Sequence, residues 1–554
     1  MNQHMRVGAS CAVIGLICAL NIRSALADGN LHNLQHIIVV MQENHSFDNY
    51  FGALGYVPGG PYHTPRRSDS DDGHDRDHAT GCRPDDHRCV DGLTCKVSAG
   101  GTFQCSNSNI DDDGSVVFSF HDSRRCAIPD IDHGWFSVHS SADFADPNDT
   151  FWHFKGDGFV RATDLTDQPD TGPETPTDDQ TMSFYTQDEL PYYYGLAQDF
   201  AISDRQFAPV MGPTFPNRAY LSAATSFGHV TTNDTLPPPG GYKPVNGTIY
   251  DLMEKHNVSW ADYFQDVPQG GSFRNFTLTS ADPHFLPLQL FLAQAAGAPN
   301  LPTLPQVSFV DPNFGFLAGR AAQNDEHPPI DIQRGQVFLS QVINAVRNGP
   351  YWKNTIIFLT YDEHGGFYDH VKPPLARQGF GFHRTPDGIF PGQCADASNP
   401  PASLQPGGGA QCSTNQISPA GSSVFTAENL CPQLAANPTG PFPRECAAFE
   451  QNGFRVPLLA VSAFSKPHYV SHEVGDHTSL LALIEKRFMT SGNKPGSDHG
   501  HDGDQYGIDF TRPHLTNRDL FANTLEDMFD FDNSPSLQTQ VGTAQPPVND
   551  CTPK

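Results

Sequence analysis

The sequence predicts an α/β protein in which a mostly parallel central sheet is covered by helices on both faces. Three apolar runs rich in β-branched residues, at positions 37–41, 354–363 and 455–464, are typical of strands buried on both faces. Residues 335–349 and 477–488 instead carry apolar side chains at helical spacing, and the second segment has basic residues in its last turn. Strands that alternate with amphipathic helices indicate this architecture.

The chain is large and strongly acidic. Its 554 residues suffice for a large α/β core with insertions, and its 49 glycines and 47 prolines predict abundant loops. The formal net charge is -29. This charge argues against nucleic acid as a partner, because phosphate backbones attract basic surfaces, and against unassisted docking on an anionic bilayer. Neutral and zwitterionic substrates meet no such general barrier.

Residues 1–27 have the features of a secretory signal. Arg6 is followed by an apolar stretch, and small residues at Ala25 and Ala27 offer a cleavage site before Asp28. The apolar stretch is shorter than a membrane-spanning helix requires, and no other segment approaches that length. We therefore expect a secreted or periplasmic protein without a transmembrane segment.

Cysteine usage agrees with export. Of 12 cysteines, two lie in the leader, and the others are Cys82, Cys89, Cys95, Cys105, Cys126, Cys394, Cys412, Cys431, Cys446 and Cys551. An even number in an exported chain favours disulfides, although the spacing leaves their pairing open. A metal cluster is the alternative for the group from Cys82 to Cys105, but its spacings are irregular.

Two stretches interrupt the alternation of strands and helices. Residues 66–113 are rich in Asp, His, Gly and Cys, and residues 378–446 are rich in Pro, Gly, Ser and Ala. The first is predicted to be a disulfide-stapled insertion outside the core, and the second a long surface excursion. Both interrupt a single domain of residues 28–530, and a loosely ordered tail, 531–554, follows it.

Oxygen donors follow two of the predicted strands. Glu43 and Asn44 come after the first strand, and Asp362 and Glu363 come after the second, more than 300 positions later. Ligands of open α/β sheets bind at the carboxyl ends of the strands, so these side chains can converge there. Four oxygen donors suit a hard divalent cation. Local hydrogen bonding in the first loop, and a turn before Gly365 in the second, are the alternatives.

A third segment, "VMGPTFPNRAYLSAATSFG", predicts a turn followed by a helix. Gly212 and Pro213 force the turn, and Pro216 suits the first turn of the helix. Thr214 is then placed at the amino end, where free N–H groups favour an anion. From the residues alone its hydroxyl is an N-cap; beside a metal site it is a candidate nucleophile for phosphoryl transfer.

Four blocks occur in order along the chain: "QENHSFDNYFG", "GPTFPNR", "NDEHPP" and "YDEHGGFYDHV". Together they resemble the signature blocks of the bacterial and plant phosphoesterase family, which includes non-specific phospholipases C and a group of acid phosphatases. The resemblance implies an alkaline-phosphatase-like α/β sandwich and phosphoester hydrolysis through a covalent phospho-enzyme. The cysteine-rich insertion departs from the family pattern, and we expect it to form one wall of the pocket.

The resemblance also implies roles for individual residues. Glu43, Asn44, Asp362 and Glu363 would hold the metal together with Thr214, which is also the nucleophile, although many relatives have Ser there. His133 and His327 match family histidines and are assigned phosphate binding and protonation of the leaving group.

Three further residues are assigned to substrate binding. Asn217 and Arg218 either hold the phosphate or only cap and pack, and His477, which opens the last predicted helix, is the weakest candidate.

The favoured function is a secreted phospholipase C that cleaves phosphatidylcholine-like lipids to diacylglycerol and a phosphorylated head group. A broad-specificity acid phosphatase acting on small phosphomonoesters is the first alternative, because the same site serves both reactions. A non-catalytic secreted binding protein is the second. The expected cofactor is a divalent metal ion, with calcium, magnesium, manganese and iron as candidates. The oligomeric state stays open.

Overall fold

The computed structural model describes most of the chain. The described residues are 31–65, 81–111, 113–125, 130–143, 154–166, 179–230, 232, 237, 240–274, 282–376, 387–389, 396, 449, 451–490, 510–537 and 542–546. The predicted signal and nearly all of the second insertion lie outside them.

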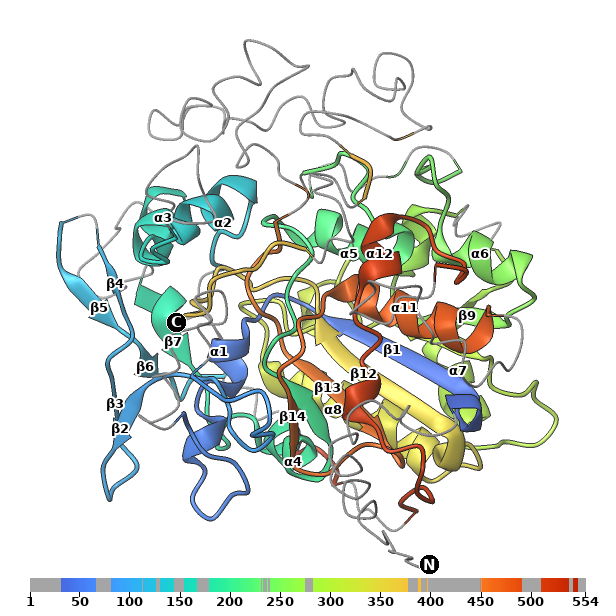
Figure 1. The fold of residues 1–554 in the computed structure, drawn as a ribbon, viewed down its shortest axis with the longest axis horizontal. Helices are drawn as coiled ribbons and strands as arrows, with labels where there is room; N and C mark the ends of the chain where they lie inside the picture. Colours follow the sequence, from blue (N-terminus) through green and yellow to red (C-terminus); the bar gives the residue numbers. More distant parts are fainter. Residues whose placement is uncertain are drawn as a thin grey trace, which may run out of the picture.

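An eight-stranded sheet forms the centre of the molecule, in the order β10-β9-β11-β1-β12-β13-β8-β14 (Figure 1). The strands are β1 (His36–Gln42), β8 (Ala201–Ser203), β9 (Trp260–Phe264), β10 (Phe285–Pro287), β11 (Val307–Val310), β12 (Thr355–Tyr361), β13 (Leu458–Ser462) and β14 (Tyr469–Ser471). β13 runs antiparallel to both neighbours, and every other pairing is parallel. The strands β11, β1 and β12 therefore end at one edge of the sheet.

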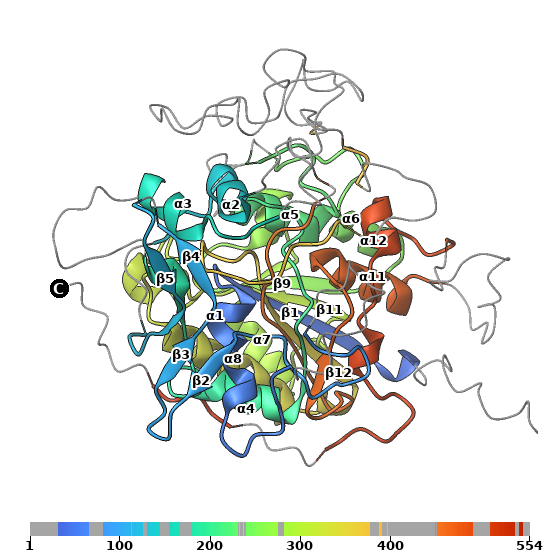
Figure 2. The same cartoon turned by 60° about the vertical axis from the view of Figure 1, so that its left-hand side comes forward.

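Helices cover both faces of this sheet (Figures 1 and 2). One face carries α4 (Pro191–Asp199), α7 (Leu288–Ala295) and α8 (Ile332–Arg347), and the other carries α5 (Thr214–Ala223), α6 (Ile249–Lys255), α11 (His477–Phe488) and α12 (Asn517–Phe521). Alternate residues of β1 face the two layers: Ile38 packs in the core that includes Phe338 of α8, and Ile37 in the core that includes Leu480 of α11. Because successive side chains of a strand point to opposite faces, β1 contributes to both cores.

The predicted strands and helices are confirmed, with two differences. The third predicted strand is β13, and it runs antiparallel to both β12 and β8 in the otherwise parallel sheet. Helix α8 begins at Ile332, three residues before the predicted start, because Asp331 caps it by accepting a hydrogen bond from the backbone of Gln333.

Two β-hairpins, one within the first insertion and one that crosses its end at residue 113, lie on the side of the molecule toward which β1 runs (Figure 1). They are β2 (Cys95–Val97) with β3 (Phe103–Cys105), and β4 (Ser108–Ile110) with β5 (Val116–Phe118). Disulfides join Cys82 to Cys89 and Cys95 to Cys105, so disulfide bonding is confirmed here and the metal-cluster alternative is wrong for these four. The remaining cysteines beyond the leader lie outside the described residues.

Part of the insertion nevertheless belongs to the core. Val90 is buried in the same apolar cluster as Ile38, and the carboxylate of Asp91 pairs with Arg205 at 2.5 Å. The prediction that residues 66–113 stay outside the core is therefore wrong for Val90 and Asp91. Their buried contacts attach the insertion to the central domain.

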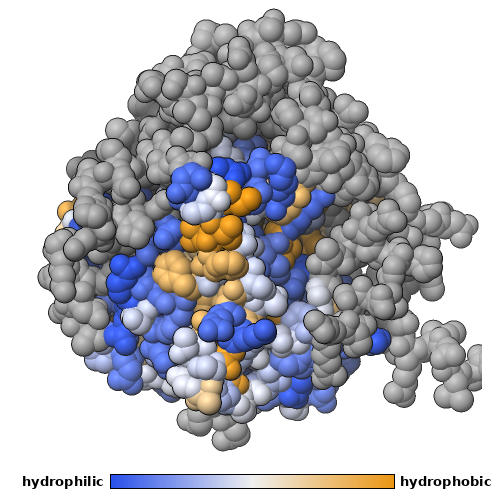
Figure 3. Space-filling view, turned by 90° about the vertical axis from the view of Figure 1, so that its left-hand side faces the viewer, coloured by the Kyte–Doolittle hydropathy of each residue, from blue (hydrophilic) through white to orange (hydrophobic). Residues whose placement is uncertain are grey.

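Apolar side chains gather over the hairpins on the face shown in Figure 3. Ile110 and Val116 lie opposite each other across the β4–β5 pair, and Phe118 is two residues from Val116 on the same face. These side chains, with Val97 on β2, are 40–53% exposed.

The smaller elements are α1 (Phe47–Phe51), α2 (Trp135–Ala142), α3 (Phe159–Thr166), β6 (Phe120–His121) and β7 (Ser183–Phe184), with 3-10 turns at Leu31–Asn33, Leu54–Tyr56, Asp179–Met182, Gln269–Ser272, Arg320–Ala322, Trp352–Asn354 and Glu526–Met528. Phe531 and Ala544 are buried, so the described parts of the predicted tail pack on the body. Every helix within the described ranges is too short or too polar to cross a bilayer.

Candidate active site

The end of β1 supplies the first two predicted ligands. Glu43 is buried, and its backbone N–H donates to the carbonyl of Asp325 at 2.8 Å. Asn44 adopts a left-handed backbone with φ 66°, which is uncommon for a residue with a side chain and frequent at functional sites. Its N–H donates to Asp362 Oδ1 at 3.1 Å, across 318 positions of sequence. The two strand ends therefore meet, as the sequence predicts.

The end of β12 supplies the two buried acids, Asp362 and Glu363. The chain then turns at Gly365, where φ is +67° and a Cβ would lie 2.0 Å from the carbonyl oxygen of Asn44. Only glycine allows this approach, and its N–H donates to Glu363 Oε2 at 2.8 Å. We call Glu43, Asn44, Asp362 and Glu363 the strand-end cluster.

Arg218 connects helix α5 to this cluster. Its guanidinium lies 3.1 Å from Glu43 Oε1 and 3.1 Å from Asp362 Oδ2, and it also donates to the carbonyl of Gln42 at 3.0 Å. Thr214 is the first residue of α5 and lies four positions earlier, so both side chains share one face of the helix. The threonine is thus placed one helical turn from the arginine that contacts two acids.

The N-cap of α5 is Pro213 and not Thr214, so the alternative in which the Thr214 hydroxyl caps the helix is wrong. Thr214 is half-buried at the amino end, where the backbone N–H groups favour an anion. Asn217, by contrast, is used locally: its amide accepts from the N–H of Val210 at 3.0 Å and donates to the carbonyl of Gly212 at 2.7 Å. These contacts fit the packing alternative for Asn217, which shapes the turn before the helix.

The Asn44 amide lies between acids and histidines. In the orientation that satisfies both sides, its nitrogen donates to Glu363 Oε1 at 3.0 Å and to Asp362 Oδ1 at 3.2 Å. Its oxygen then accepts from Nε2 of His133 at 3.2 Å and of His327 at 3.1 Å. The sheet edge therefore brings together the two histidines and the cluster.

His133 also lies 3.7 Å from Glu363 Oε1, and its other ring nitrogen faces the carbonyl of Ile131 at 2.7 Å. Burial opposes its charge, but the carboxylates of Glu363 and Asp130 outweigh burial and raise the pKa of His133 to about 10. His133 is therefore held as a cation that can bind an anion or donate a proton.

His477 stands behind the cluster. As the first residue of α11 it is buried, and its Nε2 donates to the backbone carbonyl of Asp362 at 2.8 Å. Burial lowers the pKa of His477 to about 4, so the ring is neutral. This hydrogen bond makes His477 a support for Asp362. None of its described contacts places the ring beside a substrate.

The acids of the cluster are short of positive charge. Burial raises the pKa of Glu43, and burial with the neighbouring Asp362 raises that of Glu363 to about 8 against the opposing effect of His133. Three buried carboxylates face Arg218, His133 and His327, yet burial still raises the pKa of two of these acids. Oxygen donors with an excess of buried negative charge are the chemistry that a hard divalent cation requires, so these residues fit such an ion.

Sequence reasoning missed two residues near His327. Asp130 lies 3.8 Å from His327 Nε2 and, with His133 and His327, forms a trio whose ligand atoms lie within 4.8 Å of one another. Glu326 is buried and accepts hydrogen bonds from the hydroxyls of Tyr50, Tyr193 and Tyr361. The sequence feature that could have indicated Glu326 is its position next to His327 in the block "NDEHPP".

Glu326 fixes the segment that carries His327. Its backbone has φ 72°, its carbonyl receives the ring of His45 at 3.0 Å, and a Cβ on Gly335 would fall 2.0 Å from its carboxylate. Burial raises the pKa of Glu326 to about 7 although the tyrosines favour the carboxylate. The acid therefore anchors this segment to α8 and to β12.

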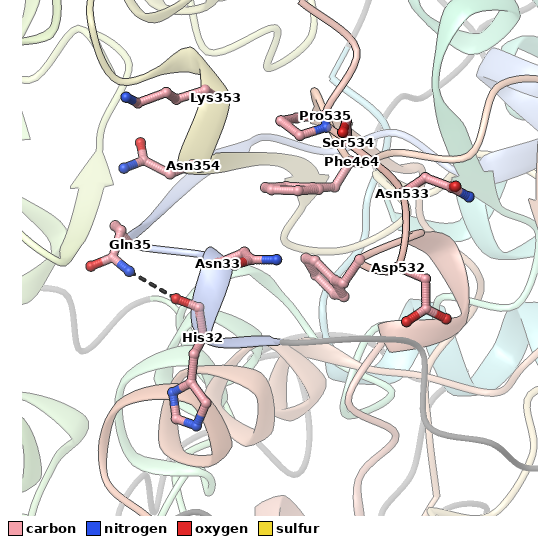
Figure 4. A pocket seen from close by; sticks show the side chains of 11 residues that line it. His32, Asn33, Gln35, Lys353, Asn354, Phe464, Asp532, Asn533, Ser534 and Pro535 are labelled. Carbon is pink, nitrogen blue, oxygen red and sulfur yellow. Dashed lines mark hydrogen bonds between the residues drawn. The ribbon is translucent and has the colours of Figure 1, made fainter.

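The site does not coincide with the cavity in Figure 4. That cavity, of about 500 Å³, is lined by Gln35 and Asn354, which precede β1 and β12, and by residues including Lys353, Phe464 and Phe531. It lies at the amino ends of these strands, and none of the predicted site residues lines it.

The similarity of this chain to known proteins is clearer in amino-acid sequence than in three-dimensional structure. Non-specific phospholipase C6 of Arabidopsis thaliana is 35% identical over 35% of this chain and 36% of its own length. Phospholipase C B of Mycobacterium tuberculosis strain H37Rv is 27% identical over 87% of this chain and 78% of its own length. The match to the plant relative thus spans only about a third of that protein's length.

The likeness to solved structures is weak. Murine ectonucleotide pyrophosphatase/phosphodiesterase 5 overlaps 54% of this chain and 89% of its own at 12% identity, with a TM-score of 0.27, which is too low to support an inference. The family model described as the Phosphoesterase family matches residues 34–491. Because that match covers most of its length, this chain belongs to the phosphoesterase family.

Proposed function

We propose that this protein is a phosphoester hydrolase that acts as a phospholipase C on phosphatidylcholine-like lipids and releases diacylglycerol and a phosphorylated head group. The observation that carries the proposal is the meeting of Glu43 and Asp362 at Arg218, one helical turn from Thr214. Family membership and relatives named phospholipase C support it. The alkaline-phosphatase-like superfamily assignment belongs to the same proposal.

The two disulfides of the first insertion support export, because such bonds persist in oxidising compartments. We therefore propose a secreted or periplasmic protein. The expected partner is a phospholipid or small phosphoester.

The strand-end cluster, with the Thr214 hydroxyl, would hold one divalent cation, and the Asn44 amide would then turn its oxygen, in place of its nitrogen, toward Asp362 and Glu363. When bound, such an ion neutralises negative charge and lowers the pKa of a coordinated hydroxyl. Calcium, magnesium, manganese and iron all accept this set of oxygen donors.

In the first step, Thr214 Oγ1 attacks the phosphorus atom and loses its proton to solvent. A bond forms between this oxygen and phosphorus, and the bond from phosphorus to the diacylglycerol oxygen breaks. His133 or His327 donates a proton to the departing oxygen, an effect worth roughly 10²–10⁴-fold in rate. The amino end of α5 and the charge on His133 favour the phosphate oxygens.

In the second step, water attacks the phosphothreonine. The oxygen of water bonds to phosphorus, the bond to Thr214 breaks, and the threonine oxygen takes a proton from solvent. The phosphorylated head group leaves, and the histidine that gave its proton regains one from the attacking water.

Replacement of the nucleophile tests this proposal. We expect Thr214→Ala to lose at least about 10⁴-fold in kcat/KM on p-nitrophenylphosphorylcholine, because the variant lacks the attacking oxygen Oγ1. Thr214→Ser, which keeps the hydroxyl, is the matched control and should retain turnover. Circular dichroism and the thermal midpoint check that both variants fold. Substantial turnover by purified Thr214→Ala would remove the nucleophile assignment.

Rates on p-nitrophenyl phosphate decide between diester and monoester preference. A higher kcat/KM on this monoester than on p-nitrophenylphosphorylcholine would replace the phospholipase proposal with a broad acid phosphatase. No turnover of either substrate across pH and divalent metals would leave a binding protein.

A further inference from the structure

A loop beside the candidate active site carries the two large apolar side chains with the highest exposed fractions among the described residues. Strand β11 lies beside β1, and the loop that follows it, residues 312–324, returns to Asp325. The carbonyl of Asp325 accepts the N–H of Glu43 at 2.8 Å, and the carbonyl of Asn324 accepts from the side chain of Gln42 at 3.4 Å. The loop therefore leaves from the strand beside β1 and returns to the end of β1.

Aromatic side chains connect the site to the tip of this loop. The guanidinium carbon of Arg218 lies 5.1 Å from the ring centre of Phe314, and the ring centres of Phe314 and Phe316 are 6.3 Å apart. Phe316 and Leu317 are 68% and 60% exposed, more than any other large apolar side chain of the described residues. The apolar tip is thus continuous with the rim of the site.

The exposure of the tip is built into the fold. The buried carboxylate of Asp266 accepts the backbone N–H of Phe316 at 2.6 Å and that of Leu317 at 3.1 Å. Gly315 and Gly319, both with positive φ, flank the pair and turn the chain around it. A fixed backbone holds two large apolar side chains in water, which is costly unless another surface covers them.

The composition of the tip identifies the surface that would cover it. The exposed residues 316–322 read "FLAGRAA", with one base and no acid, in a chain whose net charge is -29. Apolar side chains followed by a single arginine match a phospholipid interface, where the rings and branches enter the acyl boundary and the guanidinium meets phosphate. Zwitterionic headgroups avoid the repulsion that an anionic bilayer would exert on the rest of the molecule.

We propose that the loop of residues 313–322 docks the protein on zwitterionic phospholipid bilayers, with Phe316 and Leu317 inserted at the acyl boundary and Arg320 at the phosphate level. The inference rests on the proposed phospholipase function, because it assigns a lipid surface to the rim of that site. It adds the segment that brings the site to its substrate.

The test uses the full chain and phosphatidylcholine vesicles. We expect Phe316→Ser/Leu317→Ser to lower the vesicle partition coefficient, measured by flotation, roughly 100-fold, because two large apolar side chains no longer leave water. Hydrolysis of vesicle lipid should fall in parallel. Turnover of soluble p-nitrophenylphosphorylcholine should stay within about twofold of wild type, since neither residue touches the catalytic groups.

A double variant of hairpin β4–β5, Val116→Ser/Phe118→Ser, is the matched control. It removes two apolar side chains of 53% and 52% exposure and should leave vesicle binding unchanged. Phe316→Trp gives an independent readout, because its added fluorescence should be quenched by brominated acyl chains in the vesicles.

Three results would overturn the docking proposal: wild-type protein that does not float with the vesicles, a loop variant that binds like wild type, or loss of binding in the hairpin variant alone. The absence of quenching in Phe316→Trp would do the same. Failure of the proposed function is distinct, since it appears as no turnover of the soluble diester whatever the vesicle binding.

Discussion

Two buried polar clusters lie near the carboxyl ends of the central strands, and they differ in charge balance. The strand-end cluster sets three carboxylates against Arg218, His133 and His327, and the pKa of Glu43 and Glu363 stays raised. The second, which we call the buried ion network, sets four acids against four bases, all paired: Asp48, Asp91, Asp204 and Asp369 with Arg205, Arg455, His370 and His472.

The ion network is completed by the protein itself. Arg455 donates to Asp369 and Asp48 at 2.9 Å each and to the carbonyl of Asp91 at 2.7 Å. Burial opposes the charge of Asp91, yet the guanidinium of Arg205 holds its pKa below the usual range. Burial raises the pKa of Asp369 in the network to about 6, whereas in the strand-end cluster it raises the pKa of Glu43 and that of Glu363, the latter to about 8. A balanced network stabilises the fold, whereas a cluster short of positive charge is prepared for a cation from outside.

The largest expected effect concerns function in the strand-end cluster. Glu363→Gln keeps the shape of the side chain and removes one ligand charge, so kcat/KM should fall roughly 10³-fold, since a catalytic metal supplies several kcal/mol. Elemental analysis should show loss of the bound divalent metal. In chelator-treated protein the free energy of unfolding should not fall, because the change relieves repulsion among buried acids. A large loss of stability under those conditions would contradict the charge deficit.

The next effect concerns stability in the ion network. Arg455→Met leaves Asp369 buried without its charged partner and Asp48 with His370 alone, and the free energy of unfolding in urea should fall by about 3–5 kcal/mol. Arg161→Met, which removes a partly exposed ion pair with Asp143 at 3.0 Å, is the control and should cost less than about 1 kcal/mol. Equal losses in the two variants would show that the network is not the stabilising element.

The smallest effect is a pH dependence of stability that arises from His370 in the ion network. Burial opposes the charge of His370, but Asp48 and Asp91 outweigh it and raise the pKa to about 10. The stabilising effect of His370 is full below its unfolded value near 6.5 and is lost as pH rises toward 10. Relative to His370→Gln, the free energy of unfolding of wild type should fall by on the order of 1 kcal/mol over this pH range. This figure is reduced because the His370 side chain is partly exposed to solvent. Unfolding curves at several pH values check this, and a constant difference between the two proteins would refute it.

Much of the site was predictable because its ligands follow strands directly. Glu43 and Asp362 stand at the ends of two apolar runs, and parallel strands place such residues at one edge. Arg218 is different, because its pairing with Glu43 and Asp362 depends on which face of α5 packs toward β1. The local sequence does not determine that orientation. The tyrosines around Glu326, at positions 50, 193 and 361, likewise share no local pattern.

The sequence by itself determined the strands, the helices between them, the acids at the strand ends and the family blocks, since each of these depends on neighbours a few residues apart. Only the tertiary structure decided which buried acids are neutralised and which are not. The physical reason is that electrostatic balance is a sum over groups brought together from distant parts of the chain, and its strength depends on burial and on distances of a few ångströms.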